Sequence, residues 1–589
     1  MSKYSHLPLL SLLFFMFSCG GPKTETPKPL PEFSVKVRLN PEPAGLNAIT
    51  VNDAGKTIVL QYIHFAPIGL DLEKLEWTPM LAKSMPEMET DANGKQLVHV
   101  ELREEATWDD GKPVTAEDVL FSMKLAKLPT IKQNVIRGFF RDVEDILVDP
   151  QNPKKYTVVF AQPYMLSPTI AGDMTVLPKH IYDSAGALDK IKLNELHTLG
   201  DAFVADSAVI AFSEAFSSEK YNRETIVGCG PYKLESWEAG ARITLTRKKD
   251  WWGDKVKDGS HFFTANPARI QFEFIKDETA AITALKAGDL DLMYSIDPLV
   301  FTEELPKSEK FRANYNTFTP QLLGYESIGI NMRKEPFTDV NVRKALAHLA
   351  DIDRILNTVY YGLGQKITTY IPASKKEWIN NQLVPYDFNP AKAKELLALA
   401  GWTDTDGNGI LDKQVNGRKK EFKTELLYNA GNPRREKISL LYAEELEKVG
   451  IKVEIKVLEI PVLVERLKKH DFELYIGGFL QSVIESDPYQ LWHSESGKGG
   501  TNFPDFGDAA SDSLISAYRS EMDVEKRKGM LKTLQQMIHD QVPVVFLCTG
   551  KERIAIKKNL TGTVISDQRP GFWLGTMMPV ETTNASAEK

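Results

Sequence analysis

The sequence predicts an α/β protein with two lobes, because a strand–helix–strand pattern occurs twice along the chain. In the first, residues 270–274 alternate as a strand, Asp277 begins a helix, and "DLDLMY" returns as a strand. In the second, "ELLY" leads to a helix that Gly450 ends, and residues 451–457 alternate again. Each pattern favours parallel pairing through a right-handed crossover. Their wide separation in the chain indicates two α/β lobes rather than one sheet.

Length and composition favour a large globular protein. The chain has 589 residues, of which 42% are hydrophobic and 26% charged, so more than one core is expected. A net charge of -8 gives no support for nucleic-acid binding. Three cysteines in such a length exclude a disulfide-dense scaffold.

The first 32 residues carry targeting signals rather than a domain. Residues 7–17 form an apolar run that is too short to span a bilayer, and residues 1–18 are therefore expected to be a signal peptide. The run ends in "MFSCG", which resembles a bacterial lipobox and implies lipidation of Cys19. An ordinary secretory signal is the alternative. Residues 19–32 are rich in proline and polar residues and predict a tether, and no later stretch is apolar enough to cross a membrane.

Further elements follow in chain order. Alternation predicts strands at residues 35–39 and 97–102, and Thr115 is placed to cap a helix after the second of them. Residues 228–253 predict two strands joined by a hairpin at residues 238–240, and residues 328–330 predict a strand followed by helices capped at Asp339 and Asp351.

The remaining part of the chain predicts two more helices, a strand and a tail. Asn389 and Pro390 begin one helix, residues 524–540 form another, and "VPVVFLCTG" reads as a buried strand. Residues 581–589 are small and polar, and we expect a frayed tail there.

Three segments together resemble one family. These are "GINMRKEPFTDVNVRKALAHLADIDRIL" with the following "VYYGLG", "LREEATWDDGKPVTAEDV", and "GCGPYKLESWEAGARITLTRKKDWWG". They resemble family 5 extracellular solute-binding proteins, the peptide-binding components of ABC importers. The resemblance extends over most of residues 33–560.

The resemblance implies a periplasmic-binding-protein-like fold, with two α/β lobes joined by a hinge and an extra inserted lobe. Residues 33–65, 225–310 and 541–580 would form the first main lobe. Residues 66–224 would form the extra lobe, and residues 311–540 the second main lobe. A cleft between two such lobes is a usual place for a ligand.

The function that this resemblance implies is a non-enzymatic receptor outside the cytoplasm. It would be a monomer on the periplasmic or cell-surface side of the membrane, which captures a peptide and delivers it to the permease subunits of an ABC transporter. A nickel complex, an opine and a short oligosaccharide are alternative ligands within the family. An exported hydrolase is the alternative from another class, although the chain contains no Gly-x-Ser-x-Gly, His-Glu-x-x-His or Cys-x-x-Cys motif.

Seven residues are candidates for ligand binding by this resemblance. Peptide-binding relatives place an aspartate before an Asp-Pro pair to hold the peptide's ammonium group. Here Gln481 and Ser482 stand in that interval, and Glu485 is its only carboxylate. The expected neighbours in the cleft are Tyr489, Trp492, Asn502 and Phe503, and the expected partners of the peptide carboxylate are Arg434 or Arg435. For the arginines, an exposed pair in the first helical turn is the plain alternative.

Two more features predict structural chemistry. In "DTDGNGILD", five positions match an EF-hand calcium loop, namely Asp404, Asp406, Asn408, the Ile410 carbonyl and Asp412, but Val415 replaces the usual twelfth ligand. A plain turn is the alternative, and no other cofactor is expected. A disulfide between Cys229 and Cys548 is one option, and two buried free thiols are the other.

Overall fold

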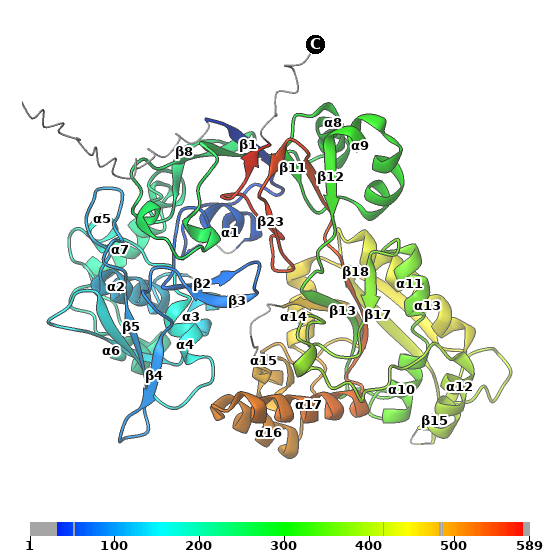
Figure 1. Cartoon of the computed structure of the whole chain (residues 1–589). Coiled ribbons are helices and arrows are strands. Elements are labelled where there is room, and N and C mark those ends of the chain that lie inside the picture. Colours follow the sequence, from blue (N-terminus) through cyan, green and yellow to red (C-terminus); the bar gives the residue numbers. More distant parts are fainter. Residues whose placement is uncertain are drawn as a thin grey trace, which may run out of the picture.

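The computed structural model describes residues 32–580, except residues 51, 52, 133, 416, 482–484 and 486. The predicted signal peptide, Cys19, nearly all of the tether, Ser482 and the expected tail lie outside the described residues. The described chain forms two α/β lobes and an additional lobe beside the first (Figure 1). The predicted fold class is therefore confirmed. None of the helices in the described ranges is long and apolar enough to cross a membrane.

A seven-stranded sheet forms the first main lobe. In spatial order its strands are β12 (Tyr315–Phe318), β21 (Ile554–Lys557), β11 (Leu292–Met293), β1 (Ser34–Arg38), β10 (Arg269–Glu273), β9 (Arg242–Arg247) and β8 (Tyr232–Glu238). β1 lies between β10 and β11 and is parallel to both, and helix α8 (Glu278–Ala287) connects those two strands. The first predicted strand–helix–strand unit is thus confirmed, with the Asp277 side chain accepting a hydrogen bond from the Ala280 amide.

The extra lobe contains a separate antiparallel sheet. Its strands, in spatial order, are β4 (Glu87–Thr90), β5 (Gln96–Glu101), β7 (Lys155–Phe160) and β6 (Val143–Val148). Helix α2 (Ala116–Lys127) begins with the predicted cap, where Thr115 and Asp118 form a capping box. A two-stranded hairpin, β2 (Ile68–Asp71) and β3 (Glu76–Pro79), extends from this side of the molecule toward the second main lobe (Figure 1).

A six-stranded sheet forms the second main lobe. Its order is β14 (Gly364–Lys366), β20 (Val544–Gly550), β13 (Gly324–Ile330), β19 (Leu474–Leu480), β17 (Lys423–Asn429) and β18 (Lys452–Leu458). β17 is parallel to both β18 and β19, as the second predicted unit requires. The predicted helices after β13 are α10 (Val340–His348) and α11 (Ile352–Thr358), and Asp339 and Asp351 cap them.

Both faces of this parallel segment are covered by helices. Leu426 of β17 packs in one core with Ile438 of α13 (Pro433–Lys448), whereas its neighbour Leu427 packs in another with Leu463 of α14 (Ile460–Lys468). Successive strand residues point to opposite faces, so the two helices lie on opposite sides. Each helix begins just after a strand ends, and α13 and α14 therefore present their amino-terminal turns at the carboxyl edge of the sheet.

The chain crosses between the two main lobes at residues 319–323 and 551–553. β12 belongs to the first sheet and β13 to the second, while β20 belongs to the second and β21 to the first. The expected lobe boundaries at 311 and 541 are therefore wrong by about ten residues in each case. Strand pairing decides these boundaries, because β12 is hydrogen-bonded to β21 and β20 to β13.

The two described cysteines are free and buried in separate surroundings. Cys229 lies in the large core of the first and extra lobes, and its carbonyl accepts hydrogen bonds from the indoles of Trp251 and Trp252. Cys548 lies on β20 in the core of the second lobe. The disulfide option is therefore wrong. Burial raises the pKa of both thiols to about 12, so little reactive thiolate forms near neutral pH.

We predict that Cys229 and Cys548 resist a thiol reagent in the native protein and react together after unfolding. Burial denies the reagent access, and the raised pKa values keep the sulfurs protonated. Labelling with a maleimide in denaturant, without reductant, should modify two thiols besides Cys19, counted by intact-mass spectrometry. A reductant-treated sample is the control, and labelling that appears only in that sample would reveal a disulfide.

Candidate functional site

A cavity of about 890 Å³ opens at the carboxyl edge of the parallel strands in the second lobe. Asn429 ends β17, Leu480 ends β19, and Ile460 begins α14 after β18, and all three line this cavity. Ligands of open α/β sheets bind in such a crevice, where helices begin and neighbouring strands diverge. Arg569, which belongs to the loop between strands β23 (Val564–Ile565) and β24 (Phe572–Trp573), also lines it. We call this space the arginine cavity.

The arginine cavity has an excess of positive charge. Its charged lining residues are Glu326, Arg434, Arg435, Lys468 and Arg569. Glu326 is already paired, because Arg435 binds it through Nε at 3.0 Å and Nη2 at 3.3 Å. Arg435 also donates to the Asn429 side chain at 2.8 Å, so its guanidinium is committed to the protein.

Arg434 differs from its neighbour. It packs against the Tyr360 ring at 5.8 Å and forms no hydrogen bond or ion pair with another described residue. The two arginines that the sequence left as alternatives are thus separated by their contacts. The N–H donors of Arg434 have no partner among the described residues and could bind a carboxylate. The guanidinium of Arg435 is paired with Glu326 of β13.

An apolar wall completes the arginine cavity. Ile460 and Val464 of α14 are 58% and 36% exposed, and Leu480 is 67% exposed, although all three line the cavity. Phe479 and Phe503 stack beside them with ring centroids 6.3 Å apart. Apolar surface left open next to free cationic donors suits a ligand that carries both a carboxylate and hydrophobic side chains.

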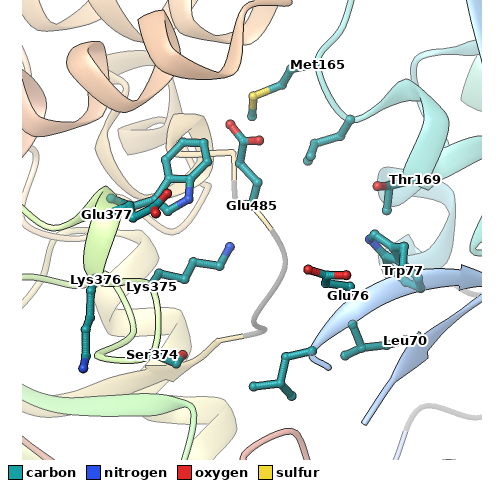
Figure 2. Close-up of a pocket in the computed structure, with 13 residues that line it drawn as sticks. Leu70, Glu76, Trp77, Met165, Thr169, Ser374, Lys375, Lys376, Glu377 and Glu485 are labelled. Atoms are coloured by element: carbon teal, nitrogen blue, oxygen red, sulfur yellow. The ribbon is translucent and has the colours of Figure 1, made fainter. Parts of the chain in front are cut away.

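A second cavity, of about 630 Å³, lies between the extra lobe and the second lobe (Figure 2). The extra lobe contributes the β2–β3 hairpin and helix α4 (Ser167–Gly172), and the second lobe contributes residues 374–378 and Glu485. Trp77 of the extra lobe and Trp378 of the second lobe both line it, and we call this space the tryptophan cavity. Glu76 and Lys375 extend into it from the two lobes, and neither side chain has a hydrogen bond or ion pair with another described residue.

Glu485, the predicted acidic anchor, lines the tryptophan cavity, but its charge is already compensated by an arginine of the protein. Arg527 binds it with Nε at 2.6 Å and Nη2 at 2.9 Å, and the Tyr518 hydroxyl donates to it at 2.8 Å. Burial and this carboxylate raise the pKa of Tyr518, so the phenol keeps its proton. Burial also lowers the pKa of Lys375 to about 8, against the attraction of Glu485.

Comparison with known proteins supplies the family. Residues 76–501 match the family described as bacterial extracellular solute-binding proteins, family 5 Middle. The chain belongs to this family. This family 5 protein is 28% identical over 566 residues to the oligopeptide-binding protein AppA of Bacillus subtilis, a match that covers 94% of each chain.

Solved structures agree with that family. AppA of Bacillus subtilis in complex with a nonapeptide has a TM-score of 0.70 and 25% identity, over 94% of this chain and all of that one. The oligopeptide-binding protein of Thermus thermophilus with a pentapeptide has a TM-score of 0.67 over 92% of this chain and 95% of its own. At 22% identity, the second comparison supports the fold alone.

The other predicted cleft residues of this family 5 protein lie in three different settings. Phe503 lines the arginine cavity, whereas Glu485 lines the tryptophan cavity, so the structure does not place these two residues in one described cavity as expected. Trp492 is 2% exposed between Tyr370 and Phe506, and Asn502 is fully buried with its amide donating to backbone carbonyls. Those two expectations are wrong, because the segment folds inward and uses both side chains for packing.

Tyr489 is half-buried and lines neither described cavity. Its ring stacks on His493 at 4.3 Å and lies under the Arg519 guanidinium at 4.8 Å. Arg519 in turn binds Asp487 of the Asp-Pro pair at 2.7 Å. The region around Tyr489 is thus a packed support for the lobe rather than part of a described cavity wall.

Sequence reasoning missed Glu76, Lys375 and Arg569. Each lies in a different part of the chain, and no local motif distinguishes it from an ordinary surface charge. Only the approach of the lobes places them at the two cavities.

The predicted calcium loop brings Asp404, Asp406 and Asp412 together, with their carboxylate oxygens within 4.8 Å of one another. The Lys419 ammonium pairs with both Asp406 and Asp412. Asp404 accepts the Gly407 amide at 2.8 Å, as in a plain turn. The calcium site, including Asn408 and the Ile410 carbonyl, stays a prediction. The ammonium of Lys419 would compete with calcium for the carboxylates of Asp406 and Asp412.

We predict that Lys419→Gln strengthens calcium binding by the loop. The substitution removes the ammonium that competes for two of the carboxylates, and calcium prefers oxygen ligands. Isothermal titration of both proteins with calcium, and with magnesium as a control, measures the effect. Absence of heat in both proteins at millimolar calcium would leave the loop as a turn.

We further predict that Glu485→Gln and Arg527→Met each lower the free energy of unfolding by about 3 kcal/mol, because each leaves one buried partner uncompensated. The side chains of Glu485 and Arg527 are 16% and 7% exposed. Urea unfolding of both single variants and the double variant gives the coupling energy. Glu465→Gln, in an exposed ion pair, is the control and should unfold like wild type. Unchanged stability in Glu485→Gln, with lost ligand binding, would instead favour Glu485 as the anchor.

Proposed function

We propose that this family 5 protein is an extracytoplasmic receptor that captures peptides between its lobes and delivers them to the permease subunits of an ABC importer. Family membership supports the receptor role, and the relatedness to an oligopeptide-binding protein that holds a nonapeptide supports a peptide ligand. The protein acts as a monomer without catalysis, held near the membrane by a lipid on Cys19 after removal of residues 1–18. The lipidation motif in the sequence supports that location.

One observation carries the assignment of the ligand's acidic end. Arg434 lies in the arginine cavity and has no ion pair or hydrogen bond from the described residues, whereas its neighbour Arg435 is committed to Glu326. An uncommitted guanidinium at the carboxyl edge of a parallel sheet suits a carboxylate, which it binds with two parallel hydrogen bonds. We assign Arg434 to the peptide carboxylate.

The family's other ligands receive less support from the same cavities. The described lining of both cavities includes no histidine, a common ligand for nickel. Trp492, the aromatic residue considered for stacking on a sugar, is buried in the core. The long apolar wall of the arginine cavity favours hydrophobic side chains of a peptide over an opine or a sugar.

We predict that Arg434→Gln weakens peptide binding by about 10- to 100-fold, because one charge-assisted hydrogen-bonding partner is lost. The purified protein is first incubated with a mixed peptide library, and retained peptides are identified by mass spectrometry. Calorimetry with a retained peptide then compares wild type with Arg434→Gln. Arg418→Gln is the control, because it removes an equal charge from an exposed strand outside both cavities.

Three results would contradict this assignment. Shortened peptides in the library would indicate a hydrolase, and retention of no peptide would exclude the peptide receptor. Equal affinities of wild type and Arg434→Gln would remove Arg434 as the carboxylate anchor while leaving the receptor in place.

A further inference from the structure

The first lobe contributes one loop residue, Arg569, to the described lining of the arginine cavity. Residues 566–571 connect β23 and β24, which pair in antiparallel fashion at the end of the chain (Figure 1). Arg569 belongs to this loop, and it lines the cavity together with Arg434 and Arg435, which belong to α13 of the other lobe. The cavity is therefore not a property of the second lobe alone.

The loop that carries Arg569 is fixed. Ser566 donates its amide to the Gly571 carbonyl at 3.0 Å, which closes the loop. Asp567 accepts the Gln321 amide at 2.8 Å, and Gln321 lies in the first crossing between the lobes. The loop backbone that carries Arg569 is thus hydrogen-bonded to the first crossing. The position of Arg569 therefore depends on how the two lobes are oriented relative to each other.

The Arg569 side chain is exposed and uncommitted. It forms no hydrogen bond or ion pair with another described residue, and Glu326, the one carboxylate in the described lining, is taken by Arg435. Arg434 likewise forms no hydrogen bond or ion pair with another described residue, and its charge acts on Arg553 at the second crossing. Burial is the main cause of a lowered pKa of Arg553. The nearby Glu552 carboxylate opposes this shift, and the positive charge of Arg434 adds to it.

We propose that Arg569 of the first lobe and Arg434 of the second lobe hold the same ligand carboxylate between them, which makes Arg569 the residue that selects ligands with a free carboxyl terminus. This inference rests on the proposed peptide receptor and adds a specificity residue from the opposite lobe. Two unpaired guanidinium groups facing one cavity repel each other. A carboxylate between them replaces that repulsion with charge-assisted hydrogen bonds on both sides.

The arrangement also couples recognition to the contact between lobes. A carboxylate bound by Arg434 alone would stabilise only the second lobe, whereas a carboxylate shared with Arg569 links the second lobe to the first. The apolar wall of Ile460, Val464 and Leu480 lies in the same cavity, where it would receive the hydrophobic side chain next to that carboxylate. We therefore expect peptides that end in a large apolar residue to bind best.

The test compares a peptide acid with its amide. The probes are a retained library peptide ending in leucine and the same peptide with a carboxyl-terminal amide, titrated calorimetrically into wild type, Arg569→Gln, Arg569→Lys and Arg418→Gln. We expect wild type and Arg418→Gln to prefer the acid over the amide by about tenfold or more, which corresponds to one charge-assisted hydrogen bond. Arg569→Gln should lose part of that preference, because Arg434 still binds the carboxylate, and it should keep its affinity for the amide. Arg569→Lys should restore part of it, because lysine keeps the charge but not the planar fork.

The possible results separate this inference from the proposed function. If wild type binds the acid and Arg569→Gln keeps the full preference over the amide, Arg569 is not a carboxylate partner and the receptor function stands. If Arg569→Gln loses affinity for acid and amide alike, its role is structural and the inference is overturned. If wild type retains no peptide at all, the proposed function fails and this inference fails with it.

Discussion

Two short crossings of the chain hold the two main sheets together, and both cavities depend on this constraint. The first crossing is bonded to the end of β20, since the Leu322 amide donates to the Gly550 carbonyl at 2.9 Å and the Thr549 hydroxyl donates to the Leu322 carbonyl at 2.8 Å. Gln321 adds a side-chain hydrogen bond to Gly550 at 2.7 Å. Rotation about two such adjacent segments is the geometry of a hinge, and the space between the lobes is where a ligand contacts both.

The charged residues between the lobes follow a simple division. Glu326 with Arg435, and Glu485 with Arg527, form ion pairs that satisfy partly buried groups within the second lobe. Arg434, Arg569, Lys375 and Glu76 line the cavities without such partners in the described structure. A binding site needs the second kind of group, because a side chain that already has an ideal partner gains little from a ligand.

This division separates the expected acidic anchor, which is paired within the protein, from one of the two expected basic anchors, which is not. Glu485 was the only carboxylate in the interval that the family resemblance indicated, yet its charge is matched by an arginine from a helix about 40 residues further along the chain. For the basic end, adjacent arginines could not be distinguished by sequence. The orientation of the first turn of α13 separates them, because it directs Arg435 to Glu326 of β13 and leaves Arg434 toward the cavity.

The sequence by itself determined the fold class, the two strand–helix–strand units, most helix caps and the family, because these depend on local periodicity, capping chemistry and contiguous motifs. The tertiary structure alone decided the lobe boundaries at the crossings, the burial of Trp492 and Asn502, the separation of Cys229 from Cys548, and which charges remain unpaired. Hydrogen-bond partners across β12–β21 and β13–β20 lie more than 200 residues apart, and no local pattern records such a pairing. The presence of Arg569 and Arg434 in the lining of one cavity has the same origin, since the two residues belong to different lobes and lie more than 100 residues apart in the chain.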